Sequence, residues 1–182
     1  MIIGKRVRLR AIEKDDIPRF VNWLNDPEVY EHLLIIAPIS LGSEEKWYEK
    51  VMQQPSHEQP LAIEVKVGEE WVHVGNTGLH HHDWTNRSAT FAIFIGEKSY
   101  WNQGVGLETA LLTLHYGFDI LNLNRISLVV DATNLRGIRC YEKAGYVHEG
   151  RMRQAKYSNG KYIDWLLMSV LRSEWEQKHP VV

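Results

Sequence analysis

The run from Ala89 to Ile95 constrains the fold more than any other part of the chain, because it is almost wholly apolar. It is too short for an ordinary helix but long enough for a strand that is buried on both faces. A loop from Gly96 to Gln103 follows it. Beyond the loop, apolar residues recur every three or four positions from Leu107 to Phe118, as in a helix with one buried face. The sequence therefore predicts a central strand, a loop and a helix of about four turns.

The remaining elements follow from the period of the apolar residues and from turn signals such as Asn159-Gly160. In chain order they are a strand at residues 5–12, a helix at 17–24, a helix at 43–53 capped by Ser43, a hairpin of strands 61–67 and 72–79, a strand at 126–130, a helix at 134–144 and a hairpin of strands 146–157 and 161–171. Residues 28–40 fit a loop, a short helix or a strand. We therefore expect an α/β (α+β) fold, with a mixed, mostly antiparallel sheet of six to seven strands flanked by about four helices.

Length and composition narrow the class of protein. The 182 residues contain no linker-like stretch, so we expect one domain over residues 1–182. A hydrophobic fraction of 44% and a charged fraction of 24% are typical of a soluble globular protein. The net charge of −2 argues against a nucleic-acid partner. The apolar runs are shorter than the ~20 residues of a membrane-spanning helix, residues 1–12 lack the pattern of a signal peptide, and Cys140 has no partner cysteine. We expect a cytoplasmic protein.

The segment from Trp101 to Leu107 carries the first chemical signal. Gly104 and Gly106 allow the backbone to approach a ligand, and the helix that follows presents unpaired N–H groups, an arrangement that suits a pyrophosphate. The segment is not a P-loop, and it lacks the third glycine of the dinucleotide fingerprint. Glu108 would repel an anion unless its side chain points away.

A second constellation runs from Asn134 to Tyr146. A separation of seven residues places Asn134 and Tyr141 on nearly the same face of a helix, so both can address one ligand. Together with Gly104-x-Gly106, this segment closely resembles the GNAT acetyltransferase superfamily. The tail from Glu149 to Met168 resembles the branch that contains ribosomal-protein alanine acetyltransferases and spermidine acetyltransferases. In that family Arg or Gln usually stands three residues before the first glycine, where this chain has Trp101.

The resemblance implies that acetyl-CoA is the cofactor and that an amine attacks the thioester directly. Tyr141 matches the general acid, which protonates the leaving thiolate. The implied cofactor-binding residues, through backbone or side chain, are Phe94, Ile95, Gly96, Asn102, Gln103, Gly104, Val105, Gly106, Leu107, Asn134, Tyr141 and Lys143. The amine would be a protein N-terminus, a polyamine or another small amine. A homodimer formed through the C-terminal hairpin is a further implication.

The acceptor site is expected between the first two helices, at Glu28, Tyr30, Glu31 and His32. An exposed charged face explains the same residues without a function. The general base stays open. One of the histidines at positions 80–82, or Glu64, could relay the proton of the amine.

Each signal has a plain structural alternative. Tyr141 could be a core aromatic residue, and Asn134 could be a helix N-cap, which is compatible with ligand binding. Cys140 is read as packing and not as a nucleophile. Adjacent histidines on a strand point to alternating faces, so we expect no metal site at residues 80–82. The simplest structural interpretation of these histidines is a solvated turn. Rival functions are a sensor that binds acyl-CoA without catalysis and a Rossmann-like oxidoreductase. The order of the hairpins argues against the oxidoreductase.

Overall fold

The computed structural model describes residues 1–179 and contains eight strands and six α-helices within them. The strands are β1 (Ile2–Ile3), β2 (Val7–Ala11), β3 (Leu61–Val67), β4 (Glu70–Asp83), β5 (Ser88–Ile95), β6 (Arg125–Asp131), β7 (Val147–Ser158) and β8 (Lys161–Leu171). The helices are α1 (Ile17–Leu24), α2 (Pro27–Tyr30), α3 (Leu41–Val51), α4 (Val105–His115), α5 (Leu135–Ala144) and α6 (Arg172–Lys178). The α/β class is confirmed, although there are more strands and helices than expected.

The strand order is β1-β2-β3-β4-β5-β6-β8-β7. β5 pairs with β6 in parallel, whereas β1 with β2, β2 with β3, β3 with β4, β6 with β8 and β7 with β8 are antiparallel. The sheet is therefore mixed and mostly antiparallel, as expected. By its internal contacts the chain divides into a first unit, Met1–Gly78 with Ile93–Leu112, and a second unit, Leu79–Ala92 with the chain from Thr113 onward. The single domain over residues 1–182 stays a prediction, and positions 180–182 lie outside the described residues.

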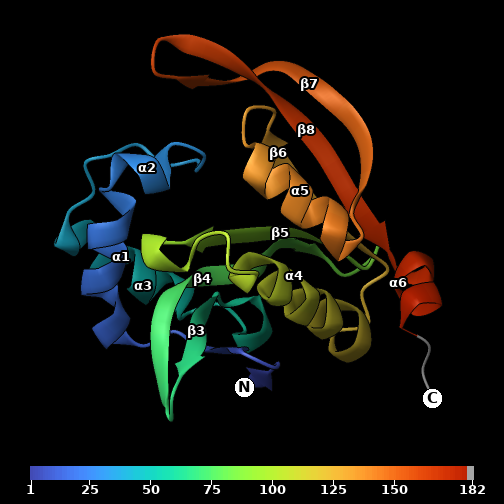
Figure 1. The fold of residues 1–182 in the computed structure, drawn as a ribbon, viewed down its shortest axis with the longest axis horizontal. Helices are drawn as coiled ribbons and strands as arrows, with labels where there is room; N and C mark the ends of the chain where they lie inside the picture. Colours follow the sequence, from blue (N-terminus) through green and yellow to red (C-terminus); the bar gives the residue numbers. More distant parts are fainter. Residues whose placement is uncertain (180–182) are drawn as a thin grey trace. The chain divides into compact units, whose positions relative to one another are not determined.

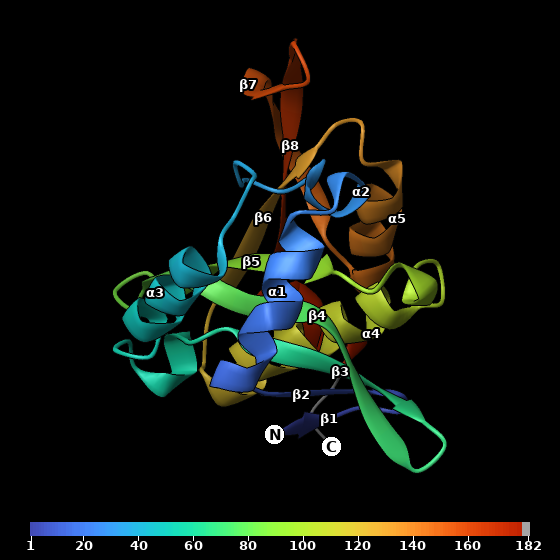
Figure 2. The ribbon, with the colours of Figure 1, turned by 90° about the vertical axis from the view of Figure 1, so that its left-hand side faces the viewer.

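In the first unit, α1 packs its apolar face against α3 and β3. Ile17, Phe20 and Leu24 recur at helical spacing and are buried together with Val51 of α3 and Ala62 of β3. Figure 2 shows α1 and α3 in front of the strands of this unit. A second cluster lies between β2, β3 and β4 and includes the first residue of α4. These two clusters hold the strands that lead to the candidate site.

In the second unit, β6 lies between β5 and β8, and its buried residues Ile126 and Leu128 are paired with Val170 and Met168 of β8. β7 and β8 form the long curved hairpin drawn in orange and red in Figure 1. Its turn at 159–160 has two positive φ angles, +49° and +78°, as the Asn-Gly pair predicts. The buried carboxylate of Asp131, at the end of β6, accepts hydrogen bonds from residues 156 and 165 of this hairpin.

Three local expectations were wrong. The cap of α3 is Ser40 and not Ser43, because Ser40 Oγ accepts the Ser43 N–H while Ser43 Oγ bonds back to Ser40. β5 is not buried on both faces, since Ala92 is exposed. Residues 80–82 belong to the end of β4 and do not form a turn. The sequence also gave no indication of α6, which buries Trp175 against Phe118, with 5.9 Å between the ring centroids.

Among residues 1–179, none of the helices combines the length and the apolar character that crossing a membrane requires.

Candidate active site

A bulge in β4 fixes the end of β5 within the first unit. His73 and Gly75 face consecutive residues of β3, so Val74 between them has no partner on β3. The Val74 carbonyl accepts two hydrogen bonds from the chain that leaves β5, from Gly96 N at 2.9 Å and from Glu97 N at 3.0 Å. The start of the loop after β5 is therefore held by one backbone oxygen.

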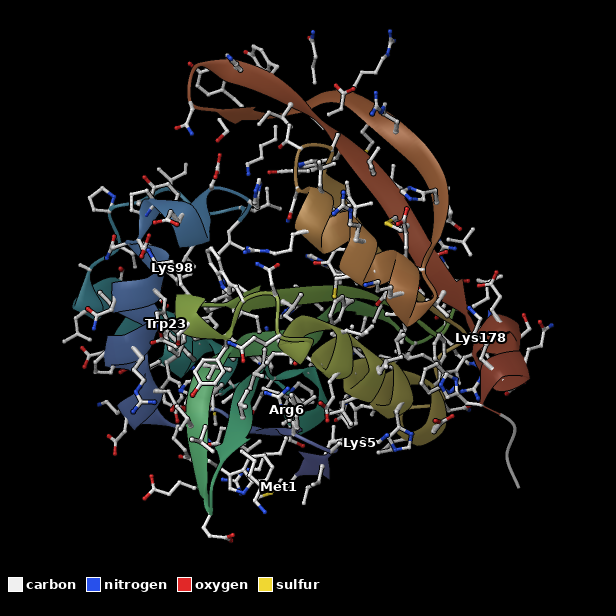
Figure 3. The ribbon with its side chains drawn as sticks, viewed as in Figure 1. Met1, Lys5, Arg6, Trp23, Lys98 and Lys178 are labelled. Carbon is white, nitrogen blue, oxygen red and sulfur yellow. The ribbon has the colours of Figure 1, made fainter. Side chains whose placement is uncertain are left out.

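Two glycines allow close approach at this point. A Cβ atom on Gly75 would lie 2.2 Å from the carbonyl oxygen of Phe94, and a Cβ atom on Gly96 would lie 2.2 Å from the ring of Trp23. Figure 3 labels Trp23 on α1, beside the end of β5. The backbone from Phe94 to Gly96, to which the family resemblance gives a role in cofactor binding, is thus packed tightly from two sides.

The loop itself is tied back to β5. The indole N–H of Trp101 donates to the Ile95 carbonyl at 2.8 Å, and Gln103 Nε2 donates to the Ser99 carbonyl at 2.5 Å. Gly104 has φ +82°, a conformation that favours glycine. Trp101 therefore serves to hold the loop on the strand. This bond occupies the only side-chain donor of Trp101, so the indole holds the loop and has no N–H left for a phosphate.

Glu108 does not oppose an anion at the start of α4. Its Oε1 atom accepts the backbone N–H groups of Arg6 at 2.9 Å and Val7 at 3.2 Å, so the carboxylate is turned toward the chain before β2. Helical bonding begins with Glu108 N donating to the Gly104 carbonyl, which leaves the N–H groups of residues 105–107 without helical acceptors. The glycine, the first turn of the helix and the turned carboxylate together suit a pyrophosphate.

This role of Glu108 gives a stability prediction. We expect Glu108→Ala to lower the free energy of unfolding by about 1–2 kcal/mol, because two backbone donors lose their acceptor. Glu108→Gln keeps an acceptor oxygen and should lose less than about half of that. Urea unfolding of the three proteins measures the difference. Equal midpoints for Glu108→Ala and the unaltered protein would contradict the prediction.

In the second unit, α5 carries Asn134 and Tyr141. Asn134 Oδ1 accepts the Gly137 N–H at 2.9 Å, so Asn134 is the N-cap of the helix, and its amide nitrogen has no hydrogen-bond partner among residues 1–179. Gly145 ends the helix with φ +103°, as expected. Asn134 can therefore cap α5 with its oxygen and still donate to a ligand with its nitrogen.

Tyr141 lies in a group of aromatic rings. Its ring centroid is 6.0 Å from that of Phe91 and 5.8 Å from that of Tyr146. Burial raises the pKa of the Tyr141 phenol, and Cys140 adds to this while Arg136 opposes it. The Tyr141 hydroxyl makes no hydrogen bond within residues 1–179 and stays protonated at neutral pH. Burial also raises the pKa of the Cys140 thiol to about 11, which argues against a nucleophilic thiolate.

Glu64 is a poor candidate for the general base. Its side chain is buried, and Arg8 Nε at 2.5 Å and Arg10 Nε at 2.8 Å bond its two oxygens. Burial alone would raise the pKa of Glu64, but the hydrogen bonds from Arg10 and Arg8 outweigh burial and lower it. A carboxylate that is paired in this way is a weak base, so its structural role is the better interpretation.

Asp16 belongs to the same ionic network. Burial opposes ionisation of Asp16, but Arg10 and His73 outweigh it and hold the pKa of the carboxyl below its usual range. Asp16 therefore stabilises the fold above the unfolded-state value of 3.8, and this contribution is lost as the pH falls below it. We expect Asp16→Asn to cost about 3 kcal/mol near neutral pH, and the cost to shrink below about pH 4. Urea midpoints measured from neutral pH down to about pH 3 test this. A cost that stays constant over that range would count against it.

The expected acceptor residues lie on and just after α2, in the first unit. Lys98 Nζ lies 2.7 Å from Asp26 Oδ2 and 2.9 Å from Glu28 Oε1, so the Glu28 carboxylate already has a cationic partner. Figure 3 labels Lys98 beside this region. Glu31 is exposed, and Tyr30 and His32 are partly buried. A cationic amine would therefore compete with Lys98 for Glu28.

Two buried polar side chains escaped the sequence analysis. Asn76 Oδ1 and the Tyr146 hydroxyl have no hydrogen-bond partner within the described part of the chain. Such atoms need water or a ligand. Tyr146 was noted only as part of a motif, and nothing in the sequence distinguishes Asn76 from an exposed strand residue.

The histidines at the end of β4 do not form a compact group. His81 is exposed with φ +51°, while the His82 ring stacks on Trp84, with 5.1 Å between centroids. In the part of the chain that the structure describes, no three His, Cys, Asp or Glu side chains could hold a metal ion together.

The chain is similar in sequence and in fold to known proteins. The acetyltransferase (GNAT) domain model matches residues 6–147. Spermidine N(1)-acetyltransferase of Escherichia coli (strain K12) is 28% identical over 182 residues, covering 95% of this chain and 90% of that protein. The crystal structure of spermidine N-acetyltransferase from Vibrio cholerae in complex with CoA and spermine has a TM-score of 0.87 and 27% identity, and the match covers 94% of this chain and 99% of that chain.

The chain belongs to the GNAT acetyltransferase family, which confirms the resemblance seen in the sequence. It is an N-acetyltransferase that uses acetyl-CoA.

Proposed function

We propose that this enzyme transfers the acetyl group of acetyl-CoA to a primary amine, with polyamines as the first acceptors to test. The observation that carries the proposal is the loop between β5 and α4, in which Gly104 adopts a positive φ and Glu108 turns its carboxylate away from the helix start. The relatives named above support a polyamine acceptor, since one is a spermidine acetyltransferase and another was crystallised with spermine.

Each of the site residues has a separate role in binding acetyl-CoA or in the reaction. The N–H groups at the start of α4, within the segment from Asn102 to Leu107, bind the pyrophosphate, and the backbone from Phe94 to Gly96 binds the pantetheine arm. Asn134 donates to the same arm through its amide nitrogen, and Lys143 adds a positive charge. The thioester supplies the acyl group and a leaving sulfur. Tyr141 donates its hydroxyl proton to that sulfur.

The acceptor amine is proposed to bind at the residues on and just after α2. Glu28 and Glu31 provide negative charge for a cationic amine, with Tyr30 and His32 beside them. The base that removes the proton of the amine stays open between a water chain and a histidine at positions 80–82, because Glu64 is paired. A protein N-terminus is the second acceptor class. The proposal has three further parts. The enzyme needs no metal ion, it works in the cytoplasm, and it forms a homodimer.

One experiment tests the proposal as a whole. Purified protein is given acetyl-CoA and a panel of spermidine, spermine and short peptides with free N-termini, and released CoA thiol is measured. We expect turnover with at least one polyamine. In parallel, calorimetry should show binding of CoA at a concentration of about 1 mM or lower. No binding at that concentration would refute the proposed function, and turnover with peptides alone would refute the polyamine assignment.

A further inference from the structure

His73 is a buried histidine of β4, next to the bulge at Val74, and the proposed chemistry gives it no role. Its side chain is 2% exposed. The ring packs edge-on against Phe20, with centroids 5.6 Å apart, and against Trp23, with centroids 5.1 Å apart. A polar ring enclosed in this way needs partners for its two nitrogens.

Both nitrogens face oxygen atoms of the protein. Nε2 lies 2.9 Å from the carbonyl oxygen of Gly75, and Nδ1 lies 3.1 Å from Asp16 Oδ1, an ion-pair contact that lacks the geometry of a hydrogen bond. A carbonyl oxygen only accepts, so Nε2 must carry a hydrogen and donate it to Gly75. Nε2 is used by Gly75, and Nδ1 is buried against Asp16, so a substrate reaches neither nitrogen. His73 therefore cannot be a base for the amine, and any role in the reaction acts through the groups that it holds.

The bond to Gly75 spans the bulge. It joins the side chain of His73 to the backbone two residues later, and Val74 lies between them. The carbonyl of Val74 is the oxygen that accepts from Gly96 N and Glu97 N, at the start of the loop after β5. The direction of this carbonyl therefore depends on the bulge, and the loop depends on the carbonyl.

The ring is itself held in place. Arg10 binds Asp16 with two hydrogen bonds, Nη1 to Oδ2 at 2.7 Å and Nη2 to Oδ1 at 2.8 Å, and Arg10 also binds Glu64. Such a bidentate pair restricts the Asp16 carboxylate to one orientation. The carboxylate in turn sets the position of the Nδ1 side of the His73 ring.

We propose that His73 is a positioning residue for cofactor binding, which sets the backbone at Gly96 and Glu97 through its hydrogen bond to Gly75 and the bulge at Val74. The inference rests on the proposed function, because it assumes that this stretch of backbone binds the arm of acetyl-CoA. It predicts that the Nε2 contact matters for the cofactor, whereas the Nδ1 contact matters mainly for stability.

Two amide substitutions separate the two contacts. His73→Gln can place an N–H near the position of Nε2, and His73→Asn can place one only near the position of Nδ1. We expect His73→Asn to raise KM for acetyl-CoA and Kd for CoA about tenfold, with kcat at saturation changed less than about threefold. We expect His73→Gln to stay within about twofold of the unaltered protein in both constants. Val65→Ala, a core truncation in the same unit, serves as the control for a loss of stability alone.

The outcomes are distinct. A rise in KM for His73→Asn that is absent in His73→Gln and Val65→Ala supports the positioning role, provided that circular dichroism shows all variants folded. Equal constants for the Asn and Gln variants, or a change in the Val65→Ala control as large as in His73→Asn, overturn it. If the unaltered protein binds no CoA, the proposed function fails first. If it binds CoA and the variants match it, only the inference about His73 fails.

Discussion

Replacing Tyr141 with Phe is expected to lower kcat for acetyl transfer by about a hundredfold or more, because the leaving sulfur loses its proton donor. The substitution removes one oxygen that makes no hydrogen bond within residues 1–179 and keeps the ring that packs on Phe91 and Tyr146. The fold should therefore be unchanged, and the Kd for CoA should move less than about threefold.

Steady-state turnover with a polyamine and calorimetry with CoA measure the two effects separately. Tyr146→Phe is the matched control, since it removes a buried hydroxyl from the neighbouring ring. We expect it to keep most of the activity. Full activity in Tyr141→Phe would remove the general acid from the proposal, and equal losses in the two variants would point to the aromatic packing instead.

The raised pKa of Tyr141 affects how readily its phenol can donate a proton. Burial raises it above its ordinary value in the protein without ligand. The phenol is then always protonated near neutral pH, but it gives up its proton less readily than an exposed tyrosine.

Gly75→Ala is expected to destabilise the protein by about 3 kcal/mol or more, or to prevent folding. The added Cβ would lie 2.2 Å from the Phe94 carbonyl oxygen and 2.9 Å from the Cα of Ile95. Both are backbone atoms, so no side-chain rotation can relieve the clash. Urea unfolding and the yield of soluble protein are the measurements.

Gly42→Ala is the control for this prediction. Gly42 is exposed in α3, and a Cβ atom there would meet nothing within 4 Å. Alanine is the better helix former, so this variant should gain about 0.5–1 kcal/mol. Gly75→Ala with unaltered stability would show that β4 and β5 can separate locally without cost.

Much of the fold was predictable because the signals were local. The period of Ile17, Phe20 and Leu24 predicted α1, and the Asn159-Gly160 pair predicted the hairpin turn between β7 and β8. The predicted numbers of strands and helices were too low because some elements are too short to show a pattern of apolar residues. β1 has only two residues, and α2 has four, which is too few to show a period.

The functional roles of the site residues stay predictions, whereas the structure does show contacts at the site that the sequence did not indicate. Gly104 and Asn134 were assigned to cofactor binding from their spacing together with the family resemblance, and the helix N-cap expected at Asn134 is confirmed. The partners of Trp101 and Glu108 depend on contacts with residues elsewhere in the sequence, which no pattern of spacing shows.

The ionic network of the first unit could not have been foreseen either. Arg8 and Arg10 alternate along β2, which suggested an exposed face, yet both bind the buried carboxylate of Glu64. The pairing depends on the register between β2 and β3, which places Arg8 opposite Glu64. Register is a property of two strands, so the charge pattern of one strand cannot reveal it.

Gly104 and Gly75 restrict substitution for different physical reasons. No protein atom lies within 4 Å of a Cβ placed at Gly104, so what the fold itself demands at this position is the handedness of the backbone. Asparagine, which tolerates left-handed backbone better than most residues, is then the natural replacement in homologous loops. A D-alanine introduced by chemical ligation should fit as well, whereas L-alanine should not.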